Sequence, residues 1–142
     1  MTKSKIPKQI VGNAGLYYIC YELSKRGWNV LPTTRNTKSV DIVIYSQNAK
    51  RTYTVQVKAL REKNPVSLGS TLNNLFADYL IVCRNVIDGK PEIFIIKIDE
   101  IKNSNLITKR KSKKNGKISY WLQINDYEKF KDNWKIIGEG YD

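Results

Sequence analysis

Apolar and polar residues alternate along two neighbouring stretches near the middle of the chain, residues 40–46 and 52–60. Such alternation predicts two half-buried strands, and the polar residues 47–51 between them predict the turn of a hairpin. Because side chains alternate along a strand, Val55 and Val57 share one face of the second strand, and Gln56 and Lys58 share the other.

A helical period precedes this hairpin. Apolar residues with the spacing of one helix face predict a helix over about residues 14–26, with Asn13 as its N-cap and Gly27 as its C-terminal cap. The helical stripe consists of Leu16, Ile19, Cys20 and Leu23. A short strand, residues 28–32, and a polar loop, residues 33–39, then lead to Asp41.

The second half of the chain predicts further strands. Residues 78–84 and 92–98 are too continuously apolar for a one-sided sheet, so helices are expected on both faces. Residues 62–74 are polar and predict a loop beside the functional face. Residues 106–109 and 117–124 predict a hairpin with a basic tip, and a capping box at residues 125–128 predicts a last helix to about Trp134.

The predicted central hairpin brings three chemically distinct side chains together. If its strands pair, Asp41 near the start of one lies close to Gln56 and Lys58 near the end of the other. A carboxylate in an apolar run is costly unless a cation or donor meets it. The alternative is an ordinary hairpin in which Asp41 caps a turn and Gln56 and Lys58 face solvent.

The charge of the chain indicates a polyanionic partner. The formal net charge is +12, and half of it lies in the predicted tip at Lys109, Arg110, Lys111, Lys113, Lys114 and Lys117, with no acid among them. Lys3, Lys5 and Lys8 form a second basic segment. A nearly balanced body with two basic appendages is typical of nucleic-acid binding, although a solvated basic loop gives the same pattern.

Other features of the composition narrow the chemistry. Histidine is absent, which excludes histidine-based triads, HNH-type nucleases and most catalytic zinc sites. Cys20 and Cys83 lie in apolar runs and are expected to be buried free thiols of a cytoplasmic protein. No apolar run approaches the ~20 residues of a membrane span, and at 142 residues we expect one domain, residues 1–142.

Fourteen residues separate Asp41 from the Gln56-Val57-Lys58 tripeptide, and this spacing resembles the metal-binding core of the PD-(D/E)xK nuclease superfamily. The resemblance extends over most of the chain and to small bacterial endonuclease-like members. Its residues are Gly12-Asn13-Ala14-Gly15-Leu16, Glu22-Leu23-Ser24-Lys25-Arg26-Gly27-Trp28, Pro32, Thr34, Asn36-Thr37, Asp41 and Gln56-Val57-Lys58.

The resemblance implies a restriction-endonuclease-like α/β fold, a mixed β-sheet flanked by helices with the basic hairpin as an extension. It also implies a Mg²⁺-dependent endonuclease of double-stranded DNA, of restriction or homing type, with Mn²⁺ able to substitute. Asp41, Gln56 and the Val57 carbonyl would bind the metal, and Asp41, Gln56 and Lys58 would be catalytic. The six basic residues of the tip would contact DNA, and a homodimer or dimer of dimers is expected by analogy.

One residue departs from the family pattern. Leu16 stands where the family has a helix glutamate that positions water, and Glu22 lies on another face of the helix. A catalytically degenerate DNA-binding module of the same fold is therefore the alternative function. An RNA-binding protein would explain the charge but not the cluster of Asp41, Gln56 and Lys58.

Overall fold

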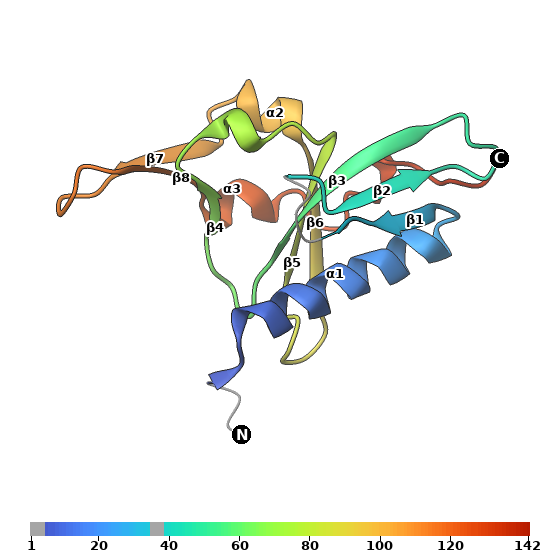
Figure 1. Cartoon of the computed structure of the whole chain (residues 1–142), viewed down its shortest axis with the longest axis horizontal. Helices are drawn as coiled ribbons and strands as arrows, with labels where there is room; N and C mark the ends of the chain where they lie inside the picture. Colours follow the sequence, from blue (N-terminus) through green and yellow to red (C-terminus); the bar gives the residue numbers. More distant parts are fainter. Residues whose placement is uncertain (1–4, 35–38) are drawn as a thin grey trace.

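Five strands form a mixed sheet at the centre of the computed structural model, which describes residues 5–34 and 39–142 (Figure 1). Their spatial order is β1-β2-β3-β5-β6, and a smaller sheet has the order β4-β8-β7. The strands are β1 (Asn29–Pro32), β2 (Ile42–Tyr45), β3 (Thr52–Ala59), β4 (Val66–Gly69), β5 (Tyr79–Arg84), β6 (Glu92–Lys97), β7 (Ile107–Lys111) and β8 (Ile118–Leu122). The helices are α1 (Lys8–Lys25), α2 (Ile98–Lys102) and α3 (Ile124–Glu128), with 3-10 turns η2 (Leu72–Asn74) and η3 (Trp134–Ile136).

The central sheet is mixed because β3 and β5 run parallel, whereas the other neighbours in it are antiparallel. The predicted hairpin of β2 and β3 is confirmed, with Ile42 opposite Val55 and Tyr45 opposite Thr52. The chain passes from β3 to the parallel β5 through β4 and η2. The predicted mixed α/β fold is therefore confirmed.

The helix α1 begins at Lys8, six residues earlier than the sequence predicted, so the assignment of Asn13 as N-cap is wrong. Pro7 is the N-cap, in extended conformation, and its carbonyl accepts hydrogen bonds from the amides of Ile10 and Val11. Proline suits a helix start because its fixed φ and missing N–H cost nothing there. The C-terminal end of the helix was predicted to within one residue: α1 ends at Lys25, and Gly27 follows with φ +93°.

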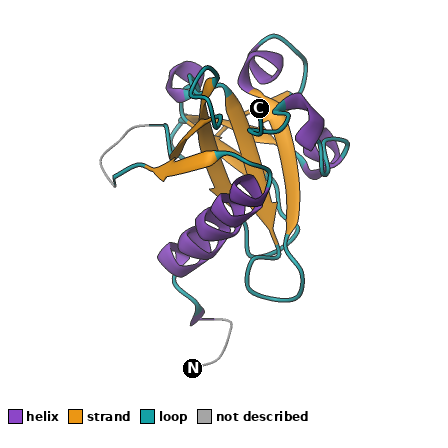
Figure 2. Cartoon of the chain, turned by 90° about the vertical axis from the view of Figure 1, so that its right-hand side faces the viewer, coloured by secondary structure: helices purple, strands orange, loops and turns teal. Residues whose placement is uncertain are grey.

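The two faces of the central sheet are covered differently. Against one face packs α1, through buried Ile19 and Leu23 (Figure 2). On the other face Leu80 and Phe94 pack against the smaller sheet and the short helices α2 and α3. The expectation of helices on both faces is therefore only partly right, because the predicted loop at residues 62–74 contributes β4 and η2 instead of remaining irregular.

The last helix is also shorter than predicted. Gln123 is the N-cap of α3 and forms a capping box with Asp126, so the box begins two residues before the predicted one. The helix ends at Glu128, and Asp132 takes φ +53°, which stops a continuous helix before Trp134. The basic hairpin of β7 and β8 is present and projects from the body as an arm (Figure 1).

A buried arginine ties α3 to the sheet. Arg84 on β5 is 6% exposed and binds Glu92 and Glu128 at 3.0 Å. Hydrogen bonds from Arg84 and Lys131 lower the pKa of Glu92 to about 2. The network satisfies a cation that would be costly to bury alone.

The two cysteines, Cys20 and Cys83, are free thiols, and Cys83 is buried. In the described part of the chain, no helix is long and apolar enough to cross a membrane.

Replacing Gly15 with alanine should destabilise the protein by about 1–3 kcal/mol, because the close packing of α1 on β3 leaves no room for a methyl group. A Cβ at Gly15 would lie 2.5 Å from the Cβ of Ala59. The matched control is Gly12→Ala in the same helix, where nothing lies within 4 Å; it should be neutral or stabilising by up to about 1 kcal/mol. Urea denaturation of both variants measures the difference, and equal stabilities would show that the helix does not depend on this contact.

Candidate active site where strands β2 and β3 part

Strands β2 and β3 separate at Asp41, immediately before the first residue of β2. The Asp41 amide donates to the Val55 carbonyl at 2.8 Å, and the Asp41 carboxylate Oδ2 accepts from the Val57 amide at 2.7 Å. Since Ile42 is opposite Val55, a continued antiparallel ladder would place Val40 opposite Val57. The carboxylate thus takes the position that the Val40 carbonyl would have in the ladder.

Thr33, the residue after β1, binds the residues just before β2 on the side away from β3. Its amide donates to the Asp41 carbonyl at 2.9 Å, and its hydroxyl donates to the Val40 carbonyl at 2.5 Å. Sequence reasoning missed Thr33, because it placed this residue in a polar loop. The signal available was a hydroxyl residue following a strand, which alone is too common to assign a role.

The Val57 backbone faces the gap between the strands. The N–H and C=O groups of one residue in a strand point to the same side. The Val57 N–H points to Asp41, so the Val57 carbonyl also points toward the end of β2. Among the described residues, no backbone hydrogen bond joins this carbonyl to Val40.

The side chains of Gln56 and Lys58 lie on the face of β3 opposite to Val57, beside Leu80 and Val82 of β5. The Gln56 carbonyl oxygen Oε1 is buried and has no hydrogen-bond partner in the described structure. Burial lowers the pKa of the Lys58 ammonium, and the charge of Asp41 raises it in part. Asp41 therefore contacts Val57 directly and acts on Lys58 through its charge, whereas among the described residues no ion pair joins Asp41 to Lys58.

The three predicted ligands offer oxygen atoms of the kind that suits a hard divalent cation. Mg²⁺ prefers oxygen ligands. Asp41 supplies a carboxylate, Gln56 a buried amide oxygen that lacks a partner, and Val57 a backbone carbonyl at the strand gap. Over the described residues no group of three His, Cys, Asp or Glu side chains could hold a metal. A cation here would depend on amide and backbone oxygens with Asp41 as the carboxylate.

The residue Leu16 lies beside Asp41. Both line a shallow hollow of about 230 Å³ between the first half of α1 and the end of β3, together with Gly12, Asn13, Val57 and Ala59. Leu16 is half-buried and packs against the apolar core under α1. The position at which the resemblance expects a glutamate therefore lies beside Asp41 and Val57, but not Gln56, and carries an apolar side chain.

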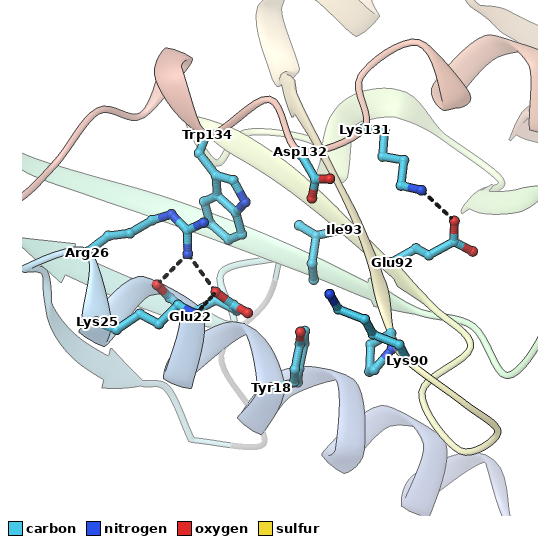
Figure 3. A pocket seen from close by; sticks show the side chains of 11 residues that line it. Tyr18, Glu22, Lys25, Arg26, Lys90, Glu92, Ile93, Lys131, Asp132 and Trp134 are labelled. Atoms are coloured by element: carbon cyan, nitrogen blue, oxygen red, sulfur yellow. Dashed lines mark hydrogen bonds and ion pairs between the residues drawn. The ribbon is translucent and has the colours of Figure 1, made fainter.

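The residue Glu22 belongs to a different hollow, of about 590 Å³, between the second half of α1 and the segment around Trp134 (Figure 3). Its carboxylate binds Arg26 at 2.6 Å and Lys25 at 3.2 Å, and the Arg26 guanidinium lies 3.9 Å from the centre of the Trp134 ring. Burial raises the pKa of Glu22, but hydrogen bonds from Arg26, Tyr18 and Lys25 outweigh burial, so its pKa is lowered. Glu22 does not line the hollow that contains Leu16 and Asp41.

The six basic residues of the predicted tip are all exposed on the arm: Lys109, Arg110, Lys111, Lys113, Lys114 and Lys117. No acidic residue occurs between Glu100 and Asp126, so their charge is not neutralised locally. Lys5 and Lys8 are also exposed, whereas Lys3 and the Asn36-Thr37 pair of the resemblance lie outside the described residues.

The central mixed sheet, the long helix and the second sheet together form an endonuclease-like fold. A solved structure of a bacterial homing endonuclease, I-Ssp6803I, matches with a TM-score of 0.61 and 17% sequence identity, over 92% of this chain and 91% of that chain. No protein-family model matches the sequence, and no curated protein matches it either. At this identity the likeness shows the fold.

Replacing Lys58 with methionine should raise the thermal unfolding midpoint at pH 7, because it removes a charge whose burial is unfavourable. Between the lowered folded pKa and the ordinary value of 10.5, unfolded Lys58 binds more protons than folded Lys58. The parent therefore gains stability as pH rises through this window, and the advantage of the variant should shrink toward pH 10.

The control for this prediction is Lys97→Met, which changes an exposed lysine on β6 and should leave the midpoint nearly unchanged. Thermal denaturation at pH 7 and pH 10 gives the comparison. A parent as stable as Lys58→Met at pH 7 would mean that the Lys58 ammonium is well solvated.

Proposed function

We propose that this chain is a Mg²⁺-dependent endonuclease that hydrolyses phosphodiester bonds of double-stranded DNA, of restriction or homing type. The observation that carries the proposal is the separation of β2 and β3, where the Asp41 carboxylate holds the Val57 amide next to a half-buried lysine, Lys58. The likeness of the fold to a homing endonuclease supports the same conclusion. Mn²⁺ is expected to substitute for Mg²⁺.

Each residue has a distinct role in this proposal. Asp41, Gln56 and the Val57 carbonyl bind the cation, which when bound supplies Lewis acidity and neutralises charge on the phosphate. The Lys58 ammonium Nζ donates hydrogen bonds to oxygens that gain negative charge during hydrolysis. Because Lys58 is partly withdrawn from water, its charge acts more strongly than a fully solvated ammonium would.

The arm supplies affinity for the substrate. Six cations without a neighbouring acid lie on the arm, which projects from the body (Figure 1). Together they create a strong positive field. Lysines and arginines that neutralise phosphates release condensed counterions, which drives binding to any DNA sequence. Cleavage of both strands of a duplex needs two active sites, so a homodimer or dimer of dimers is expected.

The alternative, a DNA-binding module that has lost cleavage, rests on Leu16. An apolar side chain beside Asp41 cannot position a water molecule or add negative charge toward a cation. Binding by the arm would be unaffected by this loss.

Replacing Leu16 with glutamate should increase plasmid cleavage in Mg²⁺ or Mn²⁺, and the additional change Asp41→Asn should abolish it. The glutamate would add a carboxylate to the hollow beside Asp41, whereas the second change removes the carboxylate ligand. Supercoiled plasmid is incubated with the parent, Leu16→Glu and Leu16→Glu/Asp41→Asn, and nicked and linear products are quantified.

The matched control is Glu22→Gln, which alters the other hollow and should leave cleavage unchanged in a folded protein. Cleavage by Leu16→Glu alone would indicate that the parent is the degenerate form. Cleavage that survives Asp41→Asn would remove Asp41 from the metal site. Binding without cleavage in every variant would favour the non-catalytic module.

Replacing Lys111, Lys113 and Lys114 with alanine should weaken binding to all duplex sequences. Each neutralised phosphate contributes about 0.9 to the slope of log K against log salt, so losing three contacts should flatten the slope by roughly 2.7. Salt titrations of binding measure both slopes. The control replaces Lys50, Lys97 and Lys135, three exposed lysines away from the arm, and an equal effect there would mean that only net charge matters.

A further inference from the structure

The smaller sheet presents two chemically different faces. Val66 and Leu122 pack into the core, and Ile107 contacts the same cluster. The strand pairs Ser67–Trp121, Thr108–Trp121 and Arg110–Ser119 place the alternate residues on the opposite, outward face. That outward face therefore consists of Ser67, Thr108, Arg110, Ser119 and Trp121.

The outward face is polar, aromatic and without negative charge. Trp121 is half-buried, and its indole N–H donates to the Ser119 hydroxyl at 2.8 Å. Trp121, Ser119 and Arg110 line a hollow of about 390 Å³ with neighbouring residues of the tip. None of the three strands contains an acidic residue.

Alternation along β7 separates its cations between the two faces. Arg110 is opposite Ser119 on the outward face, whereas Lys109 is opposite Tyr120 on the other face. Lys111 is opposite Ile118 but, near the tip, also lines the hollow with Arg110 and Ser119. The planar Arg110 fork therefore stands beside the Ser119 hydroxyl and the Trp121 ring, whereas Lys109 does not line this hollow. The strand register, and not the basic run alone, shows that Arg110 and Lys109 lie on different faces.

We infer that the outward face of the β4-β8-β7 sheet reads base edges in the major groove of duplex DNA, with Arg110 as its principal specificity-determining residue. The inference rests on the proposed function in so far as the substrate is duplex DNA. The absence of acids complements phosphates on both sides of the groove, which is about 12 Å wide and admits a β-ribbon.

The residue types on this face match the chemistry of base edges. An arginine fork donates two hydrogen bonds to O6 and N7 of guanine. Ser67, Thr108 and Ser119 donate or accept, so they tolerate several bases, and the Trp121 ring offers an apolar surface to a thymine methyl group. Lys109 on the other face is a flexible point charge, which suits a phosphate.

The test is selection from a library of random duplexes with Ca²⁺ in place of Mg²⁺, so that bound DNA stays intact. The parent should enrich a motif containing guanine. Arg110→Lys keeps the charge but removes the fork, so it should retain affinity for random DNA and lose about tenfold or more of the preference for guanine at one position. The matched control, Lys109→Ala, changes an exposed lysine on the other face and should weaken binding to all sequences while keeping the motif.

Separate outcomes distinguish this inference from the proposed function. A parent that enriches a motif unchanged by Arg110→Lys overturns the inference and leaves the nuclease proposal intact. A parent that binds random duplexes without any preference likewise overturns only the inference. A parent that binds no duplex DNA, or prefers duplex RNA in a parallel titration, overturns both. Far-UV circular dichroism of Arg110→Lys confirms that the variant is folded.

Discussion

The hydrogen bond from the Val57 amide to the Asp41 carboxylate is the interaction on which the candidate site depends. A sheet normally satisfies each strand amide with a backbone carbonyl of the next strand. Here a side chain does so, because Thr33 binds the Val40 and Asp41 carbonyls from the β1 side. The resulting gap between β2 and β3 exposes the Asp41 carboxylate and the Val57 carbonyl, while the Val57 amide keeps a hydrogen-bond partner. The fold therefore tolerates a polar site between two inner strands of an apolar sheet.

The packing around this gap explains why the site has a fixed shape. Gly15 allows α1 to approach Ala59 at the end of β3, so the first half of the helix forms one wall of the hollow beside Asp41. On the other face of β3, Leu80 and Val82 limit the water around Gln56 and Lys58. The same packing that stabilises the sheet thus lowers the pKa of Lys58 and leaves the Gln56 oxygen without a partner.

The sequence predicted the elements whose signals are local and periodic. Alternation located β2 and β3, continuous apolar runs located β5 and β6, and the basic run located the arm. The start of α1 was missed because Asn13 is a good cap by residue type, whereas the extended Pro7 that starts the helix looks like irregular structure. Strand β4 was missed because Val66 and Leu68 are too short an apolar pattern, and their burial depends on pairing with β8, which lies far along the chain. Spacing made Asp41, Gln56 and Lys58 candidates, but the role of Thr33 depends on a neighbouring strand that spacing does not reveal.

Packing of Leu16 favours the stability of the folded protein, whereas burial of Lys58 opposes it. This contrast favours the nuclease proposal over a module that only binds DNA. Leu16 in the hollow adds apolar packing and avoids a second carboxylate beside Asp41, so it favours stability. Lys58 is unfavourable to bury, and Asp41 offsets only part of the cost without forming an ion pair within the described structure. A module that only binds DNA through the arm needs neither a half-buried lysine nor a carboxylate in a strand gap. The proposed hydrolysis uses both, because the carboxylate would hold a cation and the ammonium would stabilise negative charge where it is only partly solvated.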